Sequence, residues 1–374
     1  MHNINYVDEF AIIVVFLFTI YKGTVYKKIT KISMCYAAFI IGYILYSLYL
    51  KKIVVPAIFQ DALQESKPFI VYFSFYGLLP KLDRQRKKDL NYLMLVSSVF
   101  CTIVWLIPSL SYNLLIHPAY YGKIMIVSSV IYLFTSSKNR NNIIIFFLIL
   151  SAGLICGRSK YYGEVALAAF LFIFLRDKIK IRLKYFILSV ITLVGILFVT
   201  WSKISTYLNN EEAARTVLYL TSFQIFKDYF PFGTGLGSFG EDASKVYYSP
   251  IYSEYGIDRV FGLSVEFDSF IADTYYPVII GQFGLIGIVA FIYFIYFIIK
   301  ELQSNYSSQD IINYKLSLFL IGVLLIESVA SPTFMTSLGA SILATLAFIM
   351  SEMKHNKKRN HVTTQYPGML AKLQ

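Results

Sequence analysis

Charge is scarce in this chain. Asp, Glu, Lys and Arg make up 15% of its 374 residues, whereas an average soluble domain carries about 25%. Hydrophobic residues make up 57% of the chain, and its mean hydropathy is +0.60. So little charge and so much apolar surface exclude an intrinsically disordered chain and a coiled coil. The composition is typical of a polytopic membrane protein.

Cysteine and tryptophan are also scarce, with three and two residues respectively. Cys35, Cys101 and Cys156 lie in apolar segments without paired spacing, which excludes a disulfide scaffold and a cysteine-based metal site. We interpret all three as small buried apolar residues, and we expect neither a metal nor a cofactor. The first residues lack the basic region and the small-residue cleavage site of a secretory signal.

About eleven stretches, with a range of ten to twelve, are apolar and long enough to cross a bilayer, which takes roughly 17–25 residues each. Backbone N–H and C=O groups find no water inside a bilayer, so each span is expected to be helical. The predicted fold class is an all-α polytopic integral membrane protein with one large external loop. The spans are predicted at 8–22, 32–50, 66–80, 90–108, 118–135, 142–157, 160–175, 183–201, 277–299, 315–331 and 333–353.

The basic residues predict the orientation. The net charge of +12 does not indicate nucleic-acid binding, because the Lys and Arg residues lie in short clusters between apolar spans. Of the 34 basic residues, 23 fall in the odd-numbered connections and the tail, and the positive-inside rule makes that side cytoplasmic. The N-terminus is then predicted outside and the C-terminus inside.

The longest connection divides the chain into four predicted parts. They are an N-terminal bundle of about eight helices at 1–201, a large external loop at 202–276, the C-terminal helices at 277–353 and a basic cytoplasmic tail at 354–374. The loop carries ten acidic residues against five basic ones. Loops of this length in a compact protein are usually functional, so we expect the site there.

The external loop is predicted to begin with a helix that lies at the membrane surface. Apolar and aromatic residues recur at helical spacing over 216–230, and Thr221, Ser222, Lys227 and Asp228 are expected to face water. An ordinary packed helix is the alternative.

A glycine-rich turn follows at 231–240. Residues 235–240 match the Gly-x-Gly-x-x-Gly pattern of dinucleotide-binding folds, but no βαβ unit is predicted around them. Two interpretations stay open. Gly233, Gly235 and Gly237 either bring backbone N–H groups close to a bound anion, or they form a plain tight turn.

Four cations on the predicted outer side are candidate ligands of phosphate groups. Arg158 and Lys160 lie between two spans, Lys123 lies near the outer end of the fifth span, and Arg215 opens the loop helix. Arginine binds phosphate through two parallel hydrogen bonds, and these side chains are expected to converge near the outer leaflet. Cations that only extend toward the membrane interface are the alternative.

Three carboxylates precede the ninth span, at Glu266, Asp268 and Asp273. Near a bilayer surface, desolvation raises the pKa of a carboxyl group, which suits a general base. Solvated loop acids are the alternative.

In order and spacing, these residues resemble the family of Wzy-type O-antigen or capsule polymerases and WaaL-type O-antigen ligases. The family has an Arg at an external helix junction, here Arg158, and an Arg before an aromatic loop segment, here Arg215. A proline and a Gly-x-Gly-x-Gly-x-Phe turn follow, here at 231–239. A Gly-hydrophobic-x-Gly step then lies in the next helix, here at 284–287. The topology resembles the family over nearly the whole chain, whereas the motifs cover 158–287.

The resemblance implies a metal-independent glycosyltransferase at the outer face of the bacterial plasma membrane. It would polymerise undecaprenyl-diphosphate-linked oligosaccharide repeat units into O-antigen, capsule or exopolysaccharide. Arg158 and Arg215 inherit the role of binding the lipid diphosphate, with Lys160 and Lys123 as further candidates. Its partners would be the membrane lipid itself and the flippase and chain-length regulator of the same pathway, and not nucleic acid.

The family's ligases carry a His eleven residues before the first Gly of the last step. This chain has Asp273 there, and no His in the loop. The departure favours a polymerase in which Asp273 or Asp268 prepares the acceptor hydroxyl. His117, a histidine predicted on the outer face, is the remaining candidate for the base. A ligase, and a flippase or transporter of lipid-linked glycans, stay open as alternatives.

Overall fold

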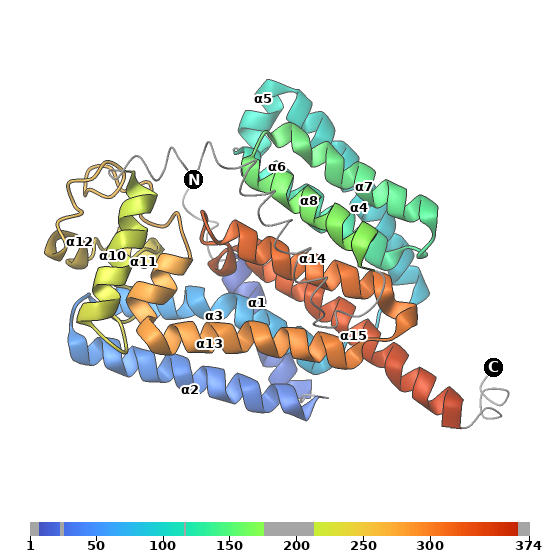
Figure 1. Cartoon of the computed structure of the whole chain (residues 1–374), viewed down its shortest axis with the longest axis horizontal. Coiled ribbons are helices and arrows are strands. Elements are labelled where there is room, and N and C mark those ends of the chain that lie inside the picture. The colour runs from blue at the N-terminus through green and yellow to red at the C-terminus, as the bar shows by residue number, and fades with distance from the viewer. Residues whose placement is uncertain (1–6, 23–25, 116, 176–212, 366–374) are drawn as a thin grey trace. The chain divides into compact units, whose positions relative to one another are not determined.

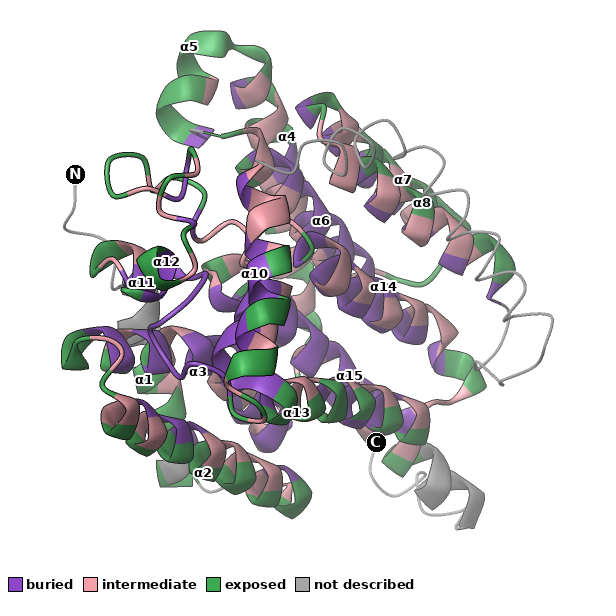
Figure 2. Ribbon diagram, turned by 60° about the vertical axis from the view of Figure 1, so that its left-hand side comes forward, coloured by how far each residue is buried: buried purple, intermediate pink, exposed green. Residues whose placement is uncertain are grey.

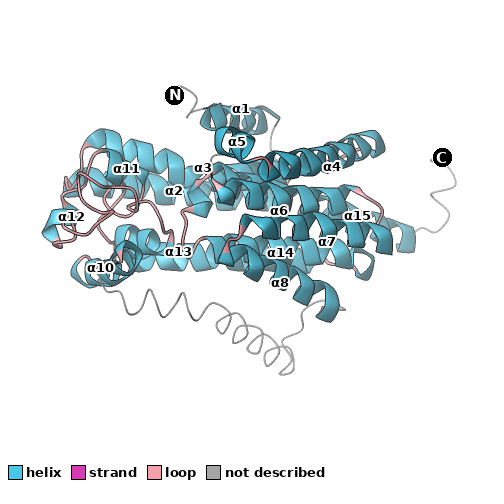
Figure 3. Ribbon diagram, turned by 90° about the horizontal axis from the view of Figure 1, so that it is seen from above, coloured by secondary structure: helices cyan, strands magenta, loops and turns pink. Residues whose placement is uncertain are grey.

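The computed structural model describes residues 7–22, 26–115, 117–175 and 213–365, and these residues form helices and loops without a strand (Figure 3). The predicted all-helical class is therefore confirmed for the described part of the chain. The predicted eighth span at 183–201 lies outside the described residues, as does the start of the external loop. The helices are α1 (Val7–Lys22), α2 (Lys27–Leu50), α3 (Val55–Leu78), α4 (Arg84–Leu106), α5 (Pro108–Leu110), α6 (Pro118–Thr135), α7 (Arg140–Ala152), α8 (Ser159–Phe174), α10 (Ala214–Asp228), α11 (Asp242–Val246), α12 (Ile251–Glu254), α13 (Tyr276–Asn305), α14 (Ile311–Glu327) and α15 (Ser337–Gln365).

Four of the described helical segments are long and apolar enough to cross a membrane: α2, α4, α13 and Ser308–Glu327. A fifth is added if the bent pair Pro108–Leu115 and Pro118–Thr135 forms one span. The helix α3, by contrast, carries Asp61, Glu65 and Lys67 in its middle, and all three are buried. Charge of this kind inside a membrane protein is expensive and usually functional.

The described residues pack into two compact units. Unit 1 takes them from 1–77, 182–300 and 327–340, and unit 2 from 78–181, 301–326 and 341–374. This division follows which segments of the backbone pack closely together, and it is separate from the four parts predicted from the membrane topology.

In unit 1, α2, α3 and α13 lie side by side (Figure 1). Their contact is largely aromatic: the rings of Tyr43 and Phe283 are 4.9 Å apart, and those of Phe69 and Phe294 are 4.5 Å apart. Most of the second half of α3 is buried, whereas the outer side of α2 is exposed (Figure 2). Cys35 lies on that exposed side, so the expectation that all three cysteines are buried is wrong for Cys35; Cys156 is buried.

The loop residues of unit 1 form a small apolar core of their own, around which α10, α11 and α12 gather (Figure 1). The orientation of α10 differs from the expectation. Thr221 and Ser222 are buried together with Leu218 and Ile225, whereas Leu220 is 55% exposed. Residues at spacings of three and four share one helix face, and the rest of the loop folds over this mixed face. Thr221 and Ser222 therefore do not face water.

In unit 2, α6 packs against α4 and α7. Trp105 of α4 stacks on Tyr121 of α6 with ring centroids 5.2 Å apart. The ring of Phe146 in α7 contacts Phe172 of α8 at 5.2 Å and Phe319 of α14 at 6.3 Å. Large aromatic side chains thus fill the spaces between the helices of this unit.

Candidate functional site

The glycine-rich turn packs onto a break in α13. Gly284 has φ 56° and ψ −147°, which interrupts the helix. The backbone there pairs with the turn: Leu285 N donates to Pro231 O at 2.9 Å, and Thr234 N donates to Gly281 O at 3.0 Å. The two glycine motifs of the family resemblance, at 231–239 and 284–287, are therefore in direct contact. Each of these bonds joins residues that are more than 45 positions apart in the sequence. Only glycine adopts the Gly284 conformation without strain.

Side chains of α2, α3 and α13 bind the other N–H groups of the turn. Leu236 N donates to Ser47 Oγ at 2.8 Å, and Gly237 N donates to Asp61 Oδ2 at 2.7 Å. Ser238 N donates to Gln282 Oε1 at 2.7 Å, and the Gln282 amide in turn donates to Asp61 Oδ2 at 3.1 Å. The turn is thus held from both sides by a buried polar network.

The hydrogen bonds of the three glycine amides bear on the two interpretations of the turn. The N–H groups of Gly233 and Gly235 donate to the backbone oxygens of Tyr229 and Gln282, each at 2.9 Å, and that of Gly237 donates to Asp61. The three glycines are buried. They serve the close approach of two backbones, and their amides are not presented to an anion in this structure.

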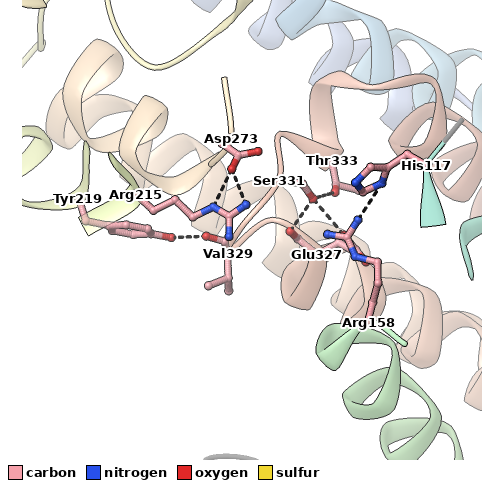
Figure 4. Close-up of polar contacts among 9 residues, drawn as sticks. All are labelled: His117, Arg158, Arg215, Tyr219, Asp273, Glu327, Val329, Ser331 and Thr333. Atoms are coloured by element: carbon pink, nitrogen blue, oxygen red, sulfur yellow. Dashed lines mark hydrogen bonds and ion pairs between the residues drawn. The ribbon is translucent and has the colours of Figure 1, made fainter. Parts of the chain in front are cut away.

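Arg215 and Asp273 form a charged pair within the long loop at 202–276. Arg215 lies in the first turn of α10, and its Nε donates to Asp273 Oδ2 at 2.7 Å, with a second bond from Nη2 to the same oxygen. The two side chains are 29% and 25% exposed, and they point toward one another (Figure 4). Asp273 Oδ1 accepts no hydrogen bond from a described residue.

One short segment aligns the two members of this pair. Tyr219 of α10, one helical turn after Arg215, donates from its hydroxyl to Val329 O at 2.8 Å. Tyr275 N, two residues after Asp273, donates to Ser328 O at 3.2 Å. Both partners are thereby fastened to the residues that follow α14, so the pair is held by backbone contacts on either side.

The other predicted carboxylates lie elsewhere. Asp268 is 3.5 Å from Lys245 Nζ, with its side chain 39% exposed, and Glu266 is exposed. A partly exposed pair of this length contributes little to stability. Of the predicted acids, Asp273 alone contacts an arginine among the described residues, which separates it from Asp268 as a candidate.

In unit 2, Arg158 and His117 lie together. Arg158 Nη1 is 3.3 Å from His117 Nδ1, and these residues precede the first turns of α8 and α6. Tyr161 holds α8 against α6 and α7. Its hydroxyl donates to Leu150 O at 2.6 Å, and its ring lies so close to Gly122 that a Cβ there would be 2.9 Å from a ring carbon.

Lys123 and Lys160 are the remaining predicted substrate contacts, and both are partly buried. The ammonium of Lys123 lies 5.9 Å from the centre of the Tyr120 ring. Lys123, Lys160 and Arg158 belong to unit 2, whereas Arg215 belongs to unit 1. Their convergence near the outer leaflet stays a prediction.

Sequence reasoning missed three buried acids, of which Asp61 holds the turn. Asp61 and Glu65, four residues apart on one face of α3, are buried, and their spacing in a moderately apolar helix was a usable signal. Glu241, at the start of α11, joins them. Burial raises the pKa of Glu241 well above its usual range and the nearby Asp61 raises it further, although the N–H groups of Ala243 and Ser244 act in the opposite direction.

Comparison with known protein-family models gives no match, and no curated protein matches the chain. Among the described residues, no group of three or more His, Cys, Asp or Glu side chains has an arrangement that could hold a metal ion. In the described part of the chain, the features that bear on function are the arginine–aspartate pair, the docked turn and the apolar helices. These features describe a helical protein that has helices apolar enough to cross a membrane, with a cationic and an acidic group side by side on a folded loop.

Proposed function

We propose that this protein is a glycosyltransferase that polymerises undecaprenyl-diphosphate-linked oligosaccharide repeat units at the outer face of the bacterial plasma membrane. The observation that carries the proposal is the Arg215–Asp273 pair, because it brings an anion-binding group and a proton acceptor to one place. The family resemblance supports it through the contact between the two glycine motifs, since residues that the family pattern joins are also joined in the fold.

Glycosyl transfer from a lipid diphosphate requires few catalytic groups. A lipid diphosphate leaves as a stabilised anion, and the charge that develops on it needs cations, which Arg215 and Arg158 supply. The acceptor hydroxyl needs orientation and a base. Asp273 Oδ1 is the proposed acceptor of that proton, while its Oδ2 stays bound to Arg215. A single displacement of this kind inverts the configuration at the anomeric carbon.

The proposed membrane topology has about eleven spans, an external loop at 202–276, the N-terminus outside and the C-terminus in the cytoplasm. Contacts within unit 2 support the assignment of several segments to one side. Lys87 forms an ion pair with Glu352 at 2.7 Å, and Asn356 donates to Asp310 at 2.8 Å. The positive-inside rule assigns the connections that hold Lys87 and Asp310, and the end of α15, to the cytoplasm.

The topology is tested with single cysteines in a variant in which Cys35, Cys101 and Cys156 are serine. A membrane-impermeant maleimide is expected to label Val246→Cys in intact cells, because Val246 is 65% exposed on the loop. It should label Arg86→Cys only after the membrane is permeabilised. Labelling of Arg86→Cys but not of Val246→Cys in intact cells would invert the topology and remove the loop from the outer face.

The activity itself is tested with purified protein and the lipid-linked repeat unit of the producing strain. A polymerase converts this donor into a ladder of chain lengths on the lipid, whereas a ligase moves a finished glycan to another acceptor. A flippase changes neither the size nor the attachment of the glycan. Intact repeat units after incubation with active, folded protein would count against the proposal.

The two candidate carboxylates are expected to differ. Asp273→Asn keeps the size of the side chain and removes the proton acceptor beside Arg215, so the ladder should disappear while the donor still binds. Asp268→Asn, which alters only the contact with Lys245, should polymerise within about threefold of the wild-type rate. If Asp273→Asn is fully active, catalysis depends on orientation or on His117 instead.

A further inference from the structure

A cavity of about 60 Å³ lies between α2, α3 and α13 in unit 1. Its walls are mainly aromatic. The rings come from α2, α3 and α13 and from Tyr275, which precedes α13. They include Tyr36, Phe39, Phe69, Phe291 and Phe294. Glu65 is the only ionisable carboxylate among the lining residues. The cavity is distinct from the Arg215–Asp273 pair, which does not line it.

The Glu65 side chain is 3% exposed, and its hydrogen bonding is incomplete. Its Oε2 accepts from the Tyr275 hydroxyl at 3.3 Å, while Oε1 has no hydrogen-bond partner among the described residues. Asp61, one helical turn away, is also fully buried and has one oxygen without a partner. Neither carboxylate forms an ion pair with a described Lys or Arg.

A buried carboxylate needs compensation for the water that it loses. The two lining tyrosines restrict which group can replace the lost hydrogen bonds to water at Glu65. The Tyr36 hydroxyl already donates to the Glu65 backbone oxygen at 3.0 Å, and the Tyr275 hydroxyl donates to the carboxylate. Their remaining capacity is that of acceptors, so an occupant of the cavity must bring hydrogen-bond donors.

We propose that this cavity is a binding site for a small primary ammonium ion, with Glu65 as its counter-ion. An alkylammonium carries three N–H donors, which matches Glu65 Oε1 and the two tyrosine oxygens. Its positive charge is stabilised by the faces of surrounding aromatic rings. Ca²⁺ and Mg²⁺ keep six or more oxygen ligands, and the lining side chains provide only those of Glu65, Tyr36 and Tyr275.

The test measures thermal unfolding of the purified full-length protein in detergent and needs no assay of transfer. Sodium, methylammonium and tetramethylammonium chlorides are compared at equal ionic strength and neutral pH. Methylammonium, at about ten times its Kd, is expected to raise the Tm by about 3 °C relative to sodium. Tetramethylammonium, which has no N–H donor, should give no rise.

Two variants and one control assign the effect to the cavity. Glu65→Gln keeps the shape of the side chain but removes its charge, and the response to methylammonium should disappear. Phe69→Leu removes a ring while keeping an apolar side chain, and methylammonium binding should weaken about fivefold. Glu254→Gln, in the surface pair with Lys52, should respond like the wild type.

An equal Tm in all three salts for the wild type would overturn the proposal, and so would an unchanged response in Glu65→Gln. An equal rise with sodium and methylammonium that Glu65→Gln abolishes would show a cation site of a different class. If Glu65→Gln does not fold, the Phe69→Leu titration decides. These outcomes do not use the polymerisation ladder. The proposed ammonium site and the proposed polymerase activity are therefore tested independently.

Discussion

Replacing Arg215 with alanine is expected to abolish polymer formation while the amount of inserted protein stays normal. Arg215 is the arginine that α10 presents to Asp273, and in the proposed mechanism it also stabilises the charge on the departing diphosphate. Loss of a charge-assisted contact to a phosphate costs about 2–3 kcal/mol, so the rate should fall about 100-fold or more. The ladder assay with purified lipid-linked repeat unit measures this.

Arg215→Lys separates charge from geometry. Lysine keeps the charge but cannot make the planar two-point contact, so rescue should be poor. Arg259→Ala is the matched control, because Arg259 is exposed in the same loop and forms no described ion pair, and it should polymerise normally. Arg158→Ala in unit 2 is expected to abolish polymer as Arg215→Ala does. Full-length ladders from the alanine variants of both arginines would exclude the proposed binding of the diphosphate.

A second large effect is expected at Gly233, and it concerns stability. Gly233 has φ +76°, and a Cβ there would lie 2.5 Å from the Gln282 backbone oxygen. Alanine at this position would have to adopt a left-handed backbone conformation, and its Cβ would clash with the backbone of α13. Neither cost can be relieved by a small shift of side chains. Gly233→Ala is expected to lose about 3 kcal/mol or more of stability, seen as a lower Tm and less monodisperse protein in detergent.

Gly256 provides the control for this change. Its φ of +68° is similar, but no atom lies within 4 Å of the position that a Cβ would take. Gly256→Ala should therefore show only the cost of the backbone conformation, about 1 kcal/mol. If both variants lose the same stability, the close approach of the turn to α13 contributes nothing beyond backbone strain.

The polar network beneath the turn shows why part of the site escaped prediction. Asp61 and Gln282 are 221 residues apart, yet they share one hydrogen bond and hold adjacent N–H groups of the turn. Local pattern indicated that the glycines form a turn, because glycine is the residue that tolerates positive φ. It did not indicate what the turn contacts, since that depends on which helices meet there. In the structure the amides bind protein groups, as a plain tight turn would.

For α10, likewise, the sequence predicted the helix but not which face is buried. Its existence followed from the spacing of apolar residues, and the structure places it at Ala214–Asp228. Its buried face, however, includes Thr221 and Ser222 and leaves Phe223 53% exposed. Hydrophobic periodicity assumes that the more apolar face is covered, whereas here the buried face of α10 also includes polar residues.

The sequence by itself determined that the described chain is all helical and contains spans apolar enough for a membrane, because an unpaired backbone is too costly in lipid. It also identified Arg215 and Asp273 as separate candidates. Only the tertiary structure decided that these two residues form a pair, that Asp61 holds the turn and that Glu65 faces an aromatic cavity. Local composition and spacing specify helices through bonds between near neighbours, whereas contacts over tens to hundreds of residues depend on how the helices pack.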